Sequence, residues 1–536
     1  MTEPEDAGAR GQDAAAGRPL SLRRRYAAAA TVCSGLFLLG LDLTVLNVAI
    51  PDLQRRLGPT MEQVQWIVDG YALVLGGTVL ALGALTDRMG RRRAFVMGLT
   101  VCGMAGMAGA VATTPEQVIA ARAIMGAGAA LFMPATLSIV TNLFPEPALR
   151  HRAIALWAVV GSAGGLTGPL IGGWLVEHFS WRAGFWLNLP VAVAVIVLAL
   201  LLVPESRALQ AEPMDIMGAA LSTIALLTLV WAVIAAPRQG WTSAPVLAGG
   251  AAAALLLASF IVREHRAKAP MLPLELLRAG RISATAASLI VMSFALYGAL
   301  FLMTLYLQGV MAYTPWQAGV RTLPLLAALG GGAIAAVPLL RRGDPMWPIT
   351  LGLAVITVAF AVLWDTQAGS GYPHLIVFQV ATGLGGGLVA AAATEAVMDA
   401  VPGHQAGIGS AINDATRQVG STLGVAVLGS VLSTVCTSRL DDLTAGRNLP
   451  PLPPGATTGG FLNPEYLARL PSPDRSHLLT AAKQAFTDGL CTAAIVTGLV
   501  TAMATAAGAL LLRRPATGTG AAHRQLAQDS WPARET

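Results

Sequence analysis

Apolar residues are gathered along the chain into long runs that are separated by short polar segments. Most runs hold about 20 residues, which is enough for an α-helix to cross the ~30 Å hydrocarbon core of a bilayer. Prolines inside the runs, such as Pro134 and Pro169, do not argue against helices, because membrane helices tolerate them. The pattern predicts fourteen spans, near residues 26–50, 65–86, 93–112, 117–140, 152–175, 183–203, 214–236, 245–264, 283–309, 316–340, 347–364, 373–398, 405–435 and 485–513.

The spans are arranged as six, two and six along the chain. We therefore predict an all-α polytopic membrane protein in which a helix pair is inserted between two six-helix bundles. The one long extracytoplasmic connection, at 436–484, is rich in proline and glycine. The predicted segments are a cytoplasmic tail at 1–25, a first bundle at 26–203, a linker with the inserted pair at 204–264, a second bundle at 265–513 that includes the loop at 436–484, and a cytoplasmic tail at 514–536.

The overall composition agrees with a membrane location and leaves no room for a large soluble domain. Hydrophobic residues make up 54% of the chain, charged residues only 12%, and the mean hydropathy is +0.62. The four cysteines lie in or near spans without metal-ligand spacing, so we expect them to pack as small apolar residues. The sequence contains neither a metal-ligand cluster nor a nucleophile constellation, which argues against an enzyme.

Basic residues are concentrated in one set of alternate loops, which predicts the orientation of the chain. The rich set holds Arg88, Arg91, Arg92, Arg93, Arg150, Arg152, Arg207, Arg263, Arg266, Lys268, Arg278, Arg281, Arg341 and Arg342. The other set holds only Arg55, Arg56, Arg182 and Arg238. Because basic loops stay in the cytoplasm, the rich side and both termini are predicted to be cytoplasmic, in the cell membrane. The net charge of +6 then follows from topology, and no nucleic-acid partner is expected.

The segment GALTDRMGRRR, Gly83–Arg93, is a charged turn between the second and third predicted spans. It leaves barely enough chain to reverse direction, and its glycines permit a tight turn and close helix approach. We predict that it lies on the cytoplasmic face and acts as a hinge. The residues assigned to it are Gly83, Asp87, Arg88, Gly90 and Arg91.

Three charged residues lie inside the first, second and fourth spans, at similar depths from the outer boundary. Asp42 is placed about 12 Å deep, Asp69 about 6 Å and Arg122 about 8 Å. A charge inside a span costs on the order of 3 kcal/mol, so each needs a partner, a cavity or a proton. Two interpretations remain open. The residues form either a static ion pair that helps the helices assemble, or a titratable carboxylate that faces a water-filled path beside a fixed guanidinium.

The fifth span carries GSAGGLTGPLIGG at Gly161–Gly173, which leaves one helix face almost bare of side chains. Small residues let a neighbouring helix approach closely, and a proline leaves the carbonyl four residues earlier without its helical hydrogen bond. The segment is either an ordinary close-packed contact or a seam that stays impermeable while helices rock. The residues assigned to it are Gly161, Gly164, Gly165, Gly168, Pro169, Gly172 and Gly173.

Charged residues also lie within the spans of the second bundle. Glu395 is placed about one turn from the cytoplasmic end of its span, where it is either an interfacial residue or a cavity acid that meets a cationic substrate. Asp414 and Arg417 share a face of the next span because they are three residues apart, and they form either a local ion pair or a functional pair. Candidate walls of a substrate cavity are Trp66, Tyr71, Phe132, Met133, Phe294, Tyr297 and Met303.

Taken in order, these segments resemble the major facilitator superfamily, and the fourteen-span layout resembles the drug:proton antiporters of that size. The resemblance covers nearly the whole chain. It is carried by GALTDRMGRRR, LDLTVLNVAIP at Leu41–Pro51, Arg122 with Gly126 and Gly128, GLTGPLIGG in the fifth span, and WRAGFWLNLPV at Trp181–Val191. Thr86 is a minor departure, because the family more usually has a smaller residue there.

The resemblance implies two six-helix bundles that rock around a central cavity. It also implies proton-driven export of drugs, antibiotics or other bulky amphiphilic compounds, which confers resistance, and it needs no cofactor. Asp42 is the first choice for the acid that exchanges a proton, and Asp87 and Arg91 would make contacts in one conformation and lose them in another. The expected partners are the amphiphilic substrate, protons and membrane lipid, with the chain as a monomer. Direct use of ATP is not expected, since the chain has no P-loop sequence.

Two other functions remain open. A proton symporter would share the fold and the hairpin, although the Gly/Pro pattern of the fifth span favours antiport. A membrane receptor or sensor would bind a ligand without proton-linked flux. The lack of room for a soluble signalling domain argues against a receptor.

Overall fold

The structure is a computed structural model that describes residues 21–207, 215–267, 280–340, 344–367, 369–400, 406–444, 457–458, 461–462 and 471–512. The predicted tails, up to residue 20 and from residue 513, lie outside the described residues, as does most of 445–470. The side chain of Asp87 in the hairpin lies outside them as well.

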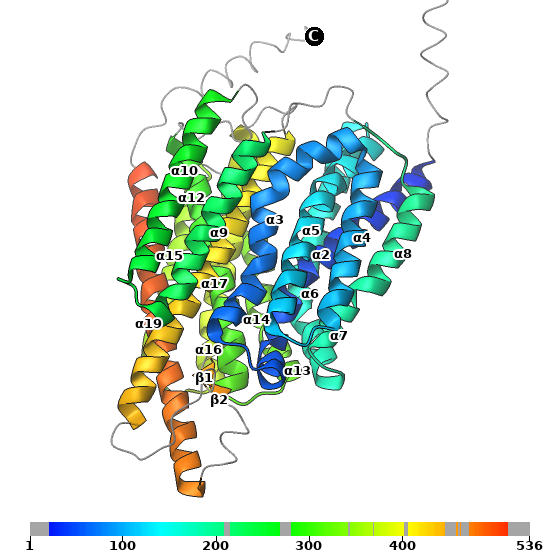
Figure 1. The fold of residues 1–536 in the computed structure, drawn as a ribbon. Helices are drawn as coiled ribbons and strands as arrows, with labels where there is room; N and C mark the ends of the chain where they lie inside the picture. The colour runs from blue at the N-terminus through cyan, green and yellow to red at the C-terminus, as the bar shows by residue number, and fades with distance from the viewer. Residues whose placement is uncertain are drawn as a thin grey trace, which may run out of the picture. The chain divides into compact units, whose positions relative to one another are not determined.

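The described part of the chain is almost entirely helical (Figure 1). Its first part contains α2 (Leu22–Leu57), α3 (Met61–Met89), α4 (Arg91–Ala110), α5 (Pro115–Leu143), α6 (Pro147–His178), α7 (Arg182–Trp186), α8 (Asn188–Leu202), α9 (Ile216–Gln239) and α10 (Ala244–Arg266). Its second part contains α12 (Gly280–Leu305) with a π-helical turn at Tyr306–Val310, α13 (Pro315–Arg321), α14 (Leu323–Leu340), α15 (Met346–Val362) with a 3-10 turn at Leu363–Asp365, α16 (Tyr372–Ala400), α17 (Ala406–Thr444) and α19 (Ser472–Leu512). Two short antiparallel strands, β1 (Thr457–Thr458) and β2 (Phe461–Leu462), pair between α17 and α19.

The helices agree closely with the predicted membrane spans. Thirteen helical stretches of the described residues are long and apolar enough to cross a membrane, and each coincides with a predicted span. The remaining predicted span, 65–86, lies inside α3, a continuous helix of 29 residues. The all-α polytopic fold is therefore confirmed, and the predicted number of spans is close.

Helices α3, α5 and α13 begin in the same way, with a threonine N-cap followed three residues later by a glutamine. The threonine side chain accepts a hydrogen bond from the glutamine backbone N–H, and the glutamine side chain accepts one from the threonine N–H. This exchange satisfies two backbone donors that would otherwise have no helical partner. The pairs are Thr60 with Gln63, Thr114 with Gln117 and Thr314 with Gln317.

The last two membrane helices are longer than predicted. α17 continues to Thr444 instead of ending near 435, and α19 begins at Ser472 instead of near 485, so they contain 39 and 41 residues. Each is roughly 60 Å long, whereas a whole bilayer is about 40–45 Å thick. Their ends pass the N-terminal ends of α3 and α5 in the same unit (Figure 1). We call residues 436–444 and 472–485 the outer extension, after the orientation predicted from the sequence. Its small core consists of Cys436, Leu440, Leu478, Ala481, Ala482 and Ala485.

The chain divides into two compact units. Unit 1 comprises Met1–Leu272, Leu300–Leu323 and Val425–Phe486. Unit 2 comprises Pro273–Ala299, Pro324–Gly424 and Thr487–Thr536. The predicted limits of the two six-helix bundles stay a prediction.

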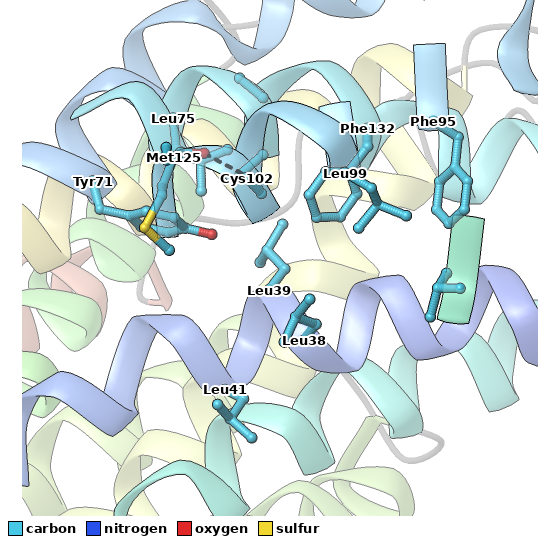
Figure 2. Close-up of a cluster of buried hydrophobic side chains, with 14 of the residues drawn as sticks. Leu38, Leu39, Leu41, Tyr71, Leu75, Phe95, Leu99, Cys102, Met125 and Phe132 are labelled. Carbon is cyan, nitrogen blue, oxygen red and sulfur yellow. Dashed lines mark hydrogen bonds between the residues drawn. The ribbon is translucent and has the colours of Figure 1, made fainter. Parts of the chain in front are cut away.

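Unit 1 has an apolar core in which α2, α3, α4 and α5 meet (Figure 2). The rings of Phe95 and Phe132 pack edge to face, with centroids 6.0 Å apart. Close helix approach makes this packing possible: a Cβ added at Gly98 of α4 would lie 2.6 Å from the carbonyl oxygen of Gly128 of α5. The packing holds α5, and with it Arg122, against its neighbours.

α6 packs on α2 through the glycines of the fifth predicted span. A Cβ added at Gly164 would overlap the carbonyl group of Phe37, and one added at Gly172 would lie 2.7 Å from the carbonyl oxygen of Val45. At these points backbone meets backbone, with no room for a side chain. The contact fixes the middle of α2, which carries Asp42.

A hydroxyl group replaces the hydrogen bond that the proline of α6 cannot make. Pro169 has no N–H, so the carbonyl oxygen of Gly165 lacks its helical donor. Thr44 of α2 donates to this oxygen at 2.9 Å. The proline and the threonine together therefore create a specific bond between the two helices.

α6 also packs closely on α13, which belongs to the same unit. A Cβ added at Gly173 would lie 2.6 Å from the carbonyl oxygen of Pro315, and one added at Gly319 would overlap the carbonyl group of Pro169. Both interpretations of the fifth span require this kind of close packing. The geometry adds that α6 has two such faces.

The inserted helices α9 and α10 are joined to other helices of unit 1 by polar contacts of α9. Thr223 of α9 donates to the carbonyl oxygen of Gly77 in α3 at 2.8 Å. Ser430 of α17 donates to the carbonyl oxygen of Val233 in α9 at 2.9 Å, and Gln65 of α3 donates to the α17 backbone at 2.8 Å. α3, α9 and α17 therefore form a hydrogen-bonded junction.

Candidate functional site

Asp42 of α2 is in direct contact with Asn188, the first residue of α8. The side-chain Nδ2 of Asn188 donates to Oδ1 of Asp42 at 2.8 Å. Only 3% of Asp42 and 1% of Asn188 is exposed. A buried carboxylate thus receives a hydrogen bond from a neutral amide.

Arg122 of α5 is held beside this pair by three groups. Its Nε donates to the carbonyl oxygen of Ile67 at 3.1 Å, and its Nη1 donates to the backbone carbonyl oxygen of Asp42 at 3.3 Å. Its Cζ lies 4.3 Å from the ring centroid of Tyr71. Backbone acceptors and an aromatic face compensate in part for the hydration that a buried guanidinium loses.

The structure brings Asp42 and Arg122 together, but in an unexpected geometry. The guanidinium binds the backbone of Asp42, whereas the carboxylate is bound by Asn188. Among the described residues, no hydrogen bond joins the two charged side chains. The carboxylate is therefore close to the positive charge of Arg122 but is not held in a bidentate ion pair with it. This arrangement favours the interpretation of a titratable carboxylate over that of a static ion pair.

Asp69 does not belong to this cluster, although its depth in the membrane is similar. It lies two residues before Tyr71, which faces Arg122, and two residues correspond to about 200° around a helix. Asp69 instead shares a face with Gln65, which contacts α17. It is 1% exposed, and its Oδ2 has no hydrogen-bond partner within the described ranges. Within the described residues, no contact brings Asp69 to Asp42 or Arg122, and its assignment to the proton path stays a prediction.

The charged residues of unit 2 are less buried. Glu395 is exposed and shares a face of α16 with the exposed Val377 and Leu384, a placement that favours the interfacial interpretation. Asp414 and Arg417, near the start of α17, are half-buried. They are close enough for the arginine charge to act on the carboxylate.

Four of the proposed cavity walls are core residues of the described structure. Tyr71, Phe132 and Met303 are buried, with Tyr71 beneath Arg122 and Phe132 packed on Phe95. Phe294 is also buried, and its backbone packs on Gly424. Large apolar side chains both fill cores and line cavities, so residue type alone could not separate the two roles. The half-buried candidates are Trp66, Met133 and Tyr297.

The predicted hairpin is mostly helical, because α3 and α4 are separated by Gly90 alone. Gly90 has a φ of +105°, a value that other residues rarely adopt. Glu205, which follows α8, accepts a hydrogen bond from the backbone N–H of Arg92 at 3.1 Å. Its carboxylate also lies 3.8 Å from the Nε atoms of Arg92 and Arg93. Glu205 therefore caps the N-terminus of α4 and neutralises part of the arginine cluster.

We expect the change Glu205→Gln to destabilise the protein by about 1 kcal/mol, because a neutral amide interacts more weakly with a helix N-terminus and two guanidinium groups. Thermal unfolding in detergent would measure the loss. Glu146→Gln is the matched control, since Glu146 stands at the N-cap of α6 and pairs with Arg25 but makes no capping hydrogen bond with its side chain. Equal melting temperatures for the two variants would contradict the capping role of Glu205.

A bundle of membrane-spanning helices with an acid and a guanidinium buried among them is typical of secondary transporters. A family model described as Major Facilitator Superfamily matches residues 32–425. The chain belongs to this superfamily.

Curated relatives extend the match to most of the chain. It is 32% identical over 491 residues to the tetracenomycin C resistance and export protein of Streptomyces glaucescens, covering 90% of both chains. It is 31% identical over 492 residues to the multidrug efflux pump LfrA of Mycolicibacterium smegmatis, covering 92% of this chain and 97% of the relative.

Solved structures support the same fold. The chain is similar to a bacterial homolog of the human lysosomal transporter Spinster, with a TM-score of 0.65 and 15% identity. The match covers 93% of this chain and 100% of that one. At this level of identity the likeness concerns the fold alone.

Proposed function

We propose that the protein exports antibiotics or other bulky amphiphilic compounds from the cytoplasm across the cell membrane. The observation that carries this proposal is the full-length similarity to resistance and efflux proteins, one named for tetracenomycin C and one for multidrug efflux. Its expected consequence is resistance to the exported compound.

We further propose that export is driven by exchange with protons at Asp42. The support is geometric: the carboxylate is buried next to Arg122 but is bound by an amide. When the site opens inward, the positive charge of Arg122 favours release of the proton and substrate binds. When it opens outward, proton uptake by Asp42 favours release of the substrate. Both termini are placed in the cytoplasm in this proposal, in agreement with the arginine-rich loops.

Two measurements test the function. A host that lacks its own efflux pumps is exposed to a chemically diverse panel of drugs with and without this chain, and resistance to at least one amphiphilic class is expected. That drug is then followed in proteoliposomes under an imposed pH gradient. Drug movement against the proton flux supports antiport, movement with it would establish symport, and binding without flux would establish a receptor.

A further inference from the structure

Asn188 lies at a buried junction between helices, with 1% of its surface exposed. It is the residue at which α8 begins, two residues after α7 ends. Its Nδ2 also lies 3.4 Å from the carbonyl oxygen of Gly184, so the amide bridges the α7–α8 corner and Asp42. On α4, Gly106 leaves the space for it, because a Cβ added there would lie 3.1 Å from the Asn188 Cβ.

The other groups that act on Asp42 come from three helices. Arg122 from α5 supplies a positive charge, while Tyr71 from α3 and Cys102 from α4 are the titratable groups within electrostatic range. Cys102 is occupied by a contact of its thiol with the carbonyl oxygen of Met125 at 3.2 Å (Figure 2). The side of Asp42 towards α8 is covered by Asn188, a group that cannot titrate.

Of the two polar atoms of the Asn188 side-chain amide, one is hydrogen-bonded to Asp42 and the other makes no hydrogen bond within the described residues. Nδ2 binds the Asp42 carboxylate, whereas Oδ1 is buried and has no partner in the described part of the chain. An amide can donate through its NH₂ group and accept through its oxygen. It can therefore satisfy an ionised carboxylate through Nδ2 and, after a half-turn, a protonated one through Oδ1.

We propose that Asn188 is the positioning residue for the proton site at Asp42. It holds the ionised carboxylate with an N–H donor and accepts the O–H of the protonated acid, so that one proton is taken up or released without leaving a buried group unsatisfied. No bond other than the O–H bond of Asp42 forms or breaks. Asn188 is at the start of α8, and its Nδ2 also contacts the carbonyl oxygen of Gly184. Rotation of the amide therefore also changes the hydrogen bonding of the α7–α8 corner.

This inference rests on the proposed proton exchange at Asp42, but it can be tested without any drug. The full-length protein, purified in lipid nanodiscs, is titrated with acid while the carbonyl stretch of protonated carboxylic acids is followed by infrared spectroscopy. The part of the signal that disappears in Asp42→Asn belongs to Asp42. Its midpoint is then compared between the unmodified protein and Asn188→Leu.

We expect the midpoint in Asn188→Leu to move by about one pH unit to higher pH, because the ionised form loses a charge-assisted hydrogen bond. Asn188→Ser, whose hydroxyl can still donate and accept, should give a smaller shift and provides the test if the leucine variant does not fold. Asn142→Leu, at an exposed asparagine of α5, is the matched control and should leave the midpoint unchanged.

An Asp42 midpoint that is the same in both Asn188 variants as in the unmodified protein would overturn the proposal. A shifted midpoint in a protein that exports no drug under a pH gradient would retain the role of Asn188 and reject the proposed function. Unchanged midpoints in a protein that does export drug in exchange for protons would reject the role of Asn188 and retain the proposed function.

Discussion

Asp42→Asn protein is expected to lose proton-driven drug accumulation by at least about tenfold while it inserts into the membrane at a normal level. The amide has nearly the shape of the carboxylate, but it cannot take up or release a proton. Drug exchange that follows the drug gradient should persist, because the substrate path is not blocked. Drug flux in proteoliposomes, with and without an imposed pH gradient, separates these two activities.

Asp442→Asn is the control for this experiment, since Asp442 is an exposed acid of the outer extension. It should retain the full response to the pH gradient. If Asp42→Asn also retained it, the proton would have to be carried elsewhere. The first candidate would then be Asp69, which is equally buried but faces a different part of unit 1.

Neighbouring glycines of α6 should respond very differently to the same small change. Gly164→Ala is expected to destabilise the protein by about 1–3 kcal/mol, because its methyl group would overlap the carbonyl group of Phe37 and force α2 and α6 apart. Gly165→Ala should be tolerated, since the nearest atom to its methyl group is the carbonyl oxygen of Gly40 at 3.7 Å, an ordinary contact.

Gly164→Ala and Gly165→Ala are matched variants, because each adds one methyl group to the same helix and brings the same gain in helix propensity. Thermal unfolding of the two purified variants in one detergent gives the comparison. The close α2–α6 contact would be wrong if Gly164→Ala were as stable as Gly165→Ala.

The number and order of the membrane helices were predictable because a bilayer imposes a fixed apolar length on each span. This constraint ends at the membrane surface, and the predicted ends of the last two helices are wrong beyond it. The ends of α17 and α19 at residues 436–444 and 472–485 are helical without being uniformly apolar. They share a small apolar core across the α17–α19 connection, and hydropathy does not report such a contact.

The candidate site was predictable only where a charge made it conspicuous. Asp42 and Arg122 stand out because charges are rare inside spans, and their depths suggested that they meet. Depth gives no direction around a helix, so Asp69 was grouped with them although it faces away. Asn188 carries no charge, and its segment was recognised only as part of a family resemblance. Nothing in the sequence indicated that its amide reaches Asp42.

The contact of Glu205 with the start of α4 could not be predicted from the sequence either. It lies more than a hundred residues from the hairpin in sequence, and an acid just outside a span is common. Only the fold, which returns α8 to the start of α4, brings it to the backbone of Arg92. Predictions for the hairpin based on its own residues therefore lacked its main partner.

Because α17 and α19 are longer than a bilayer is thick, the outer extension would give this transporter a handle outside the bilayer. By the predicted orientation it projects from the cell surface, and it is continuous with the membrane helices α17 and α19. An antibody fragment raised against it would label intact cells without reaching Asp42, and would thereby report which way the chain is inserted. The same fragment would add mass on one side of a particle that is otherwise hidden in detergent, which would help to align it in electron microscopy.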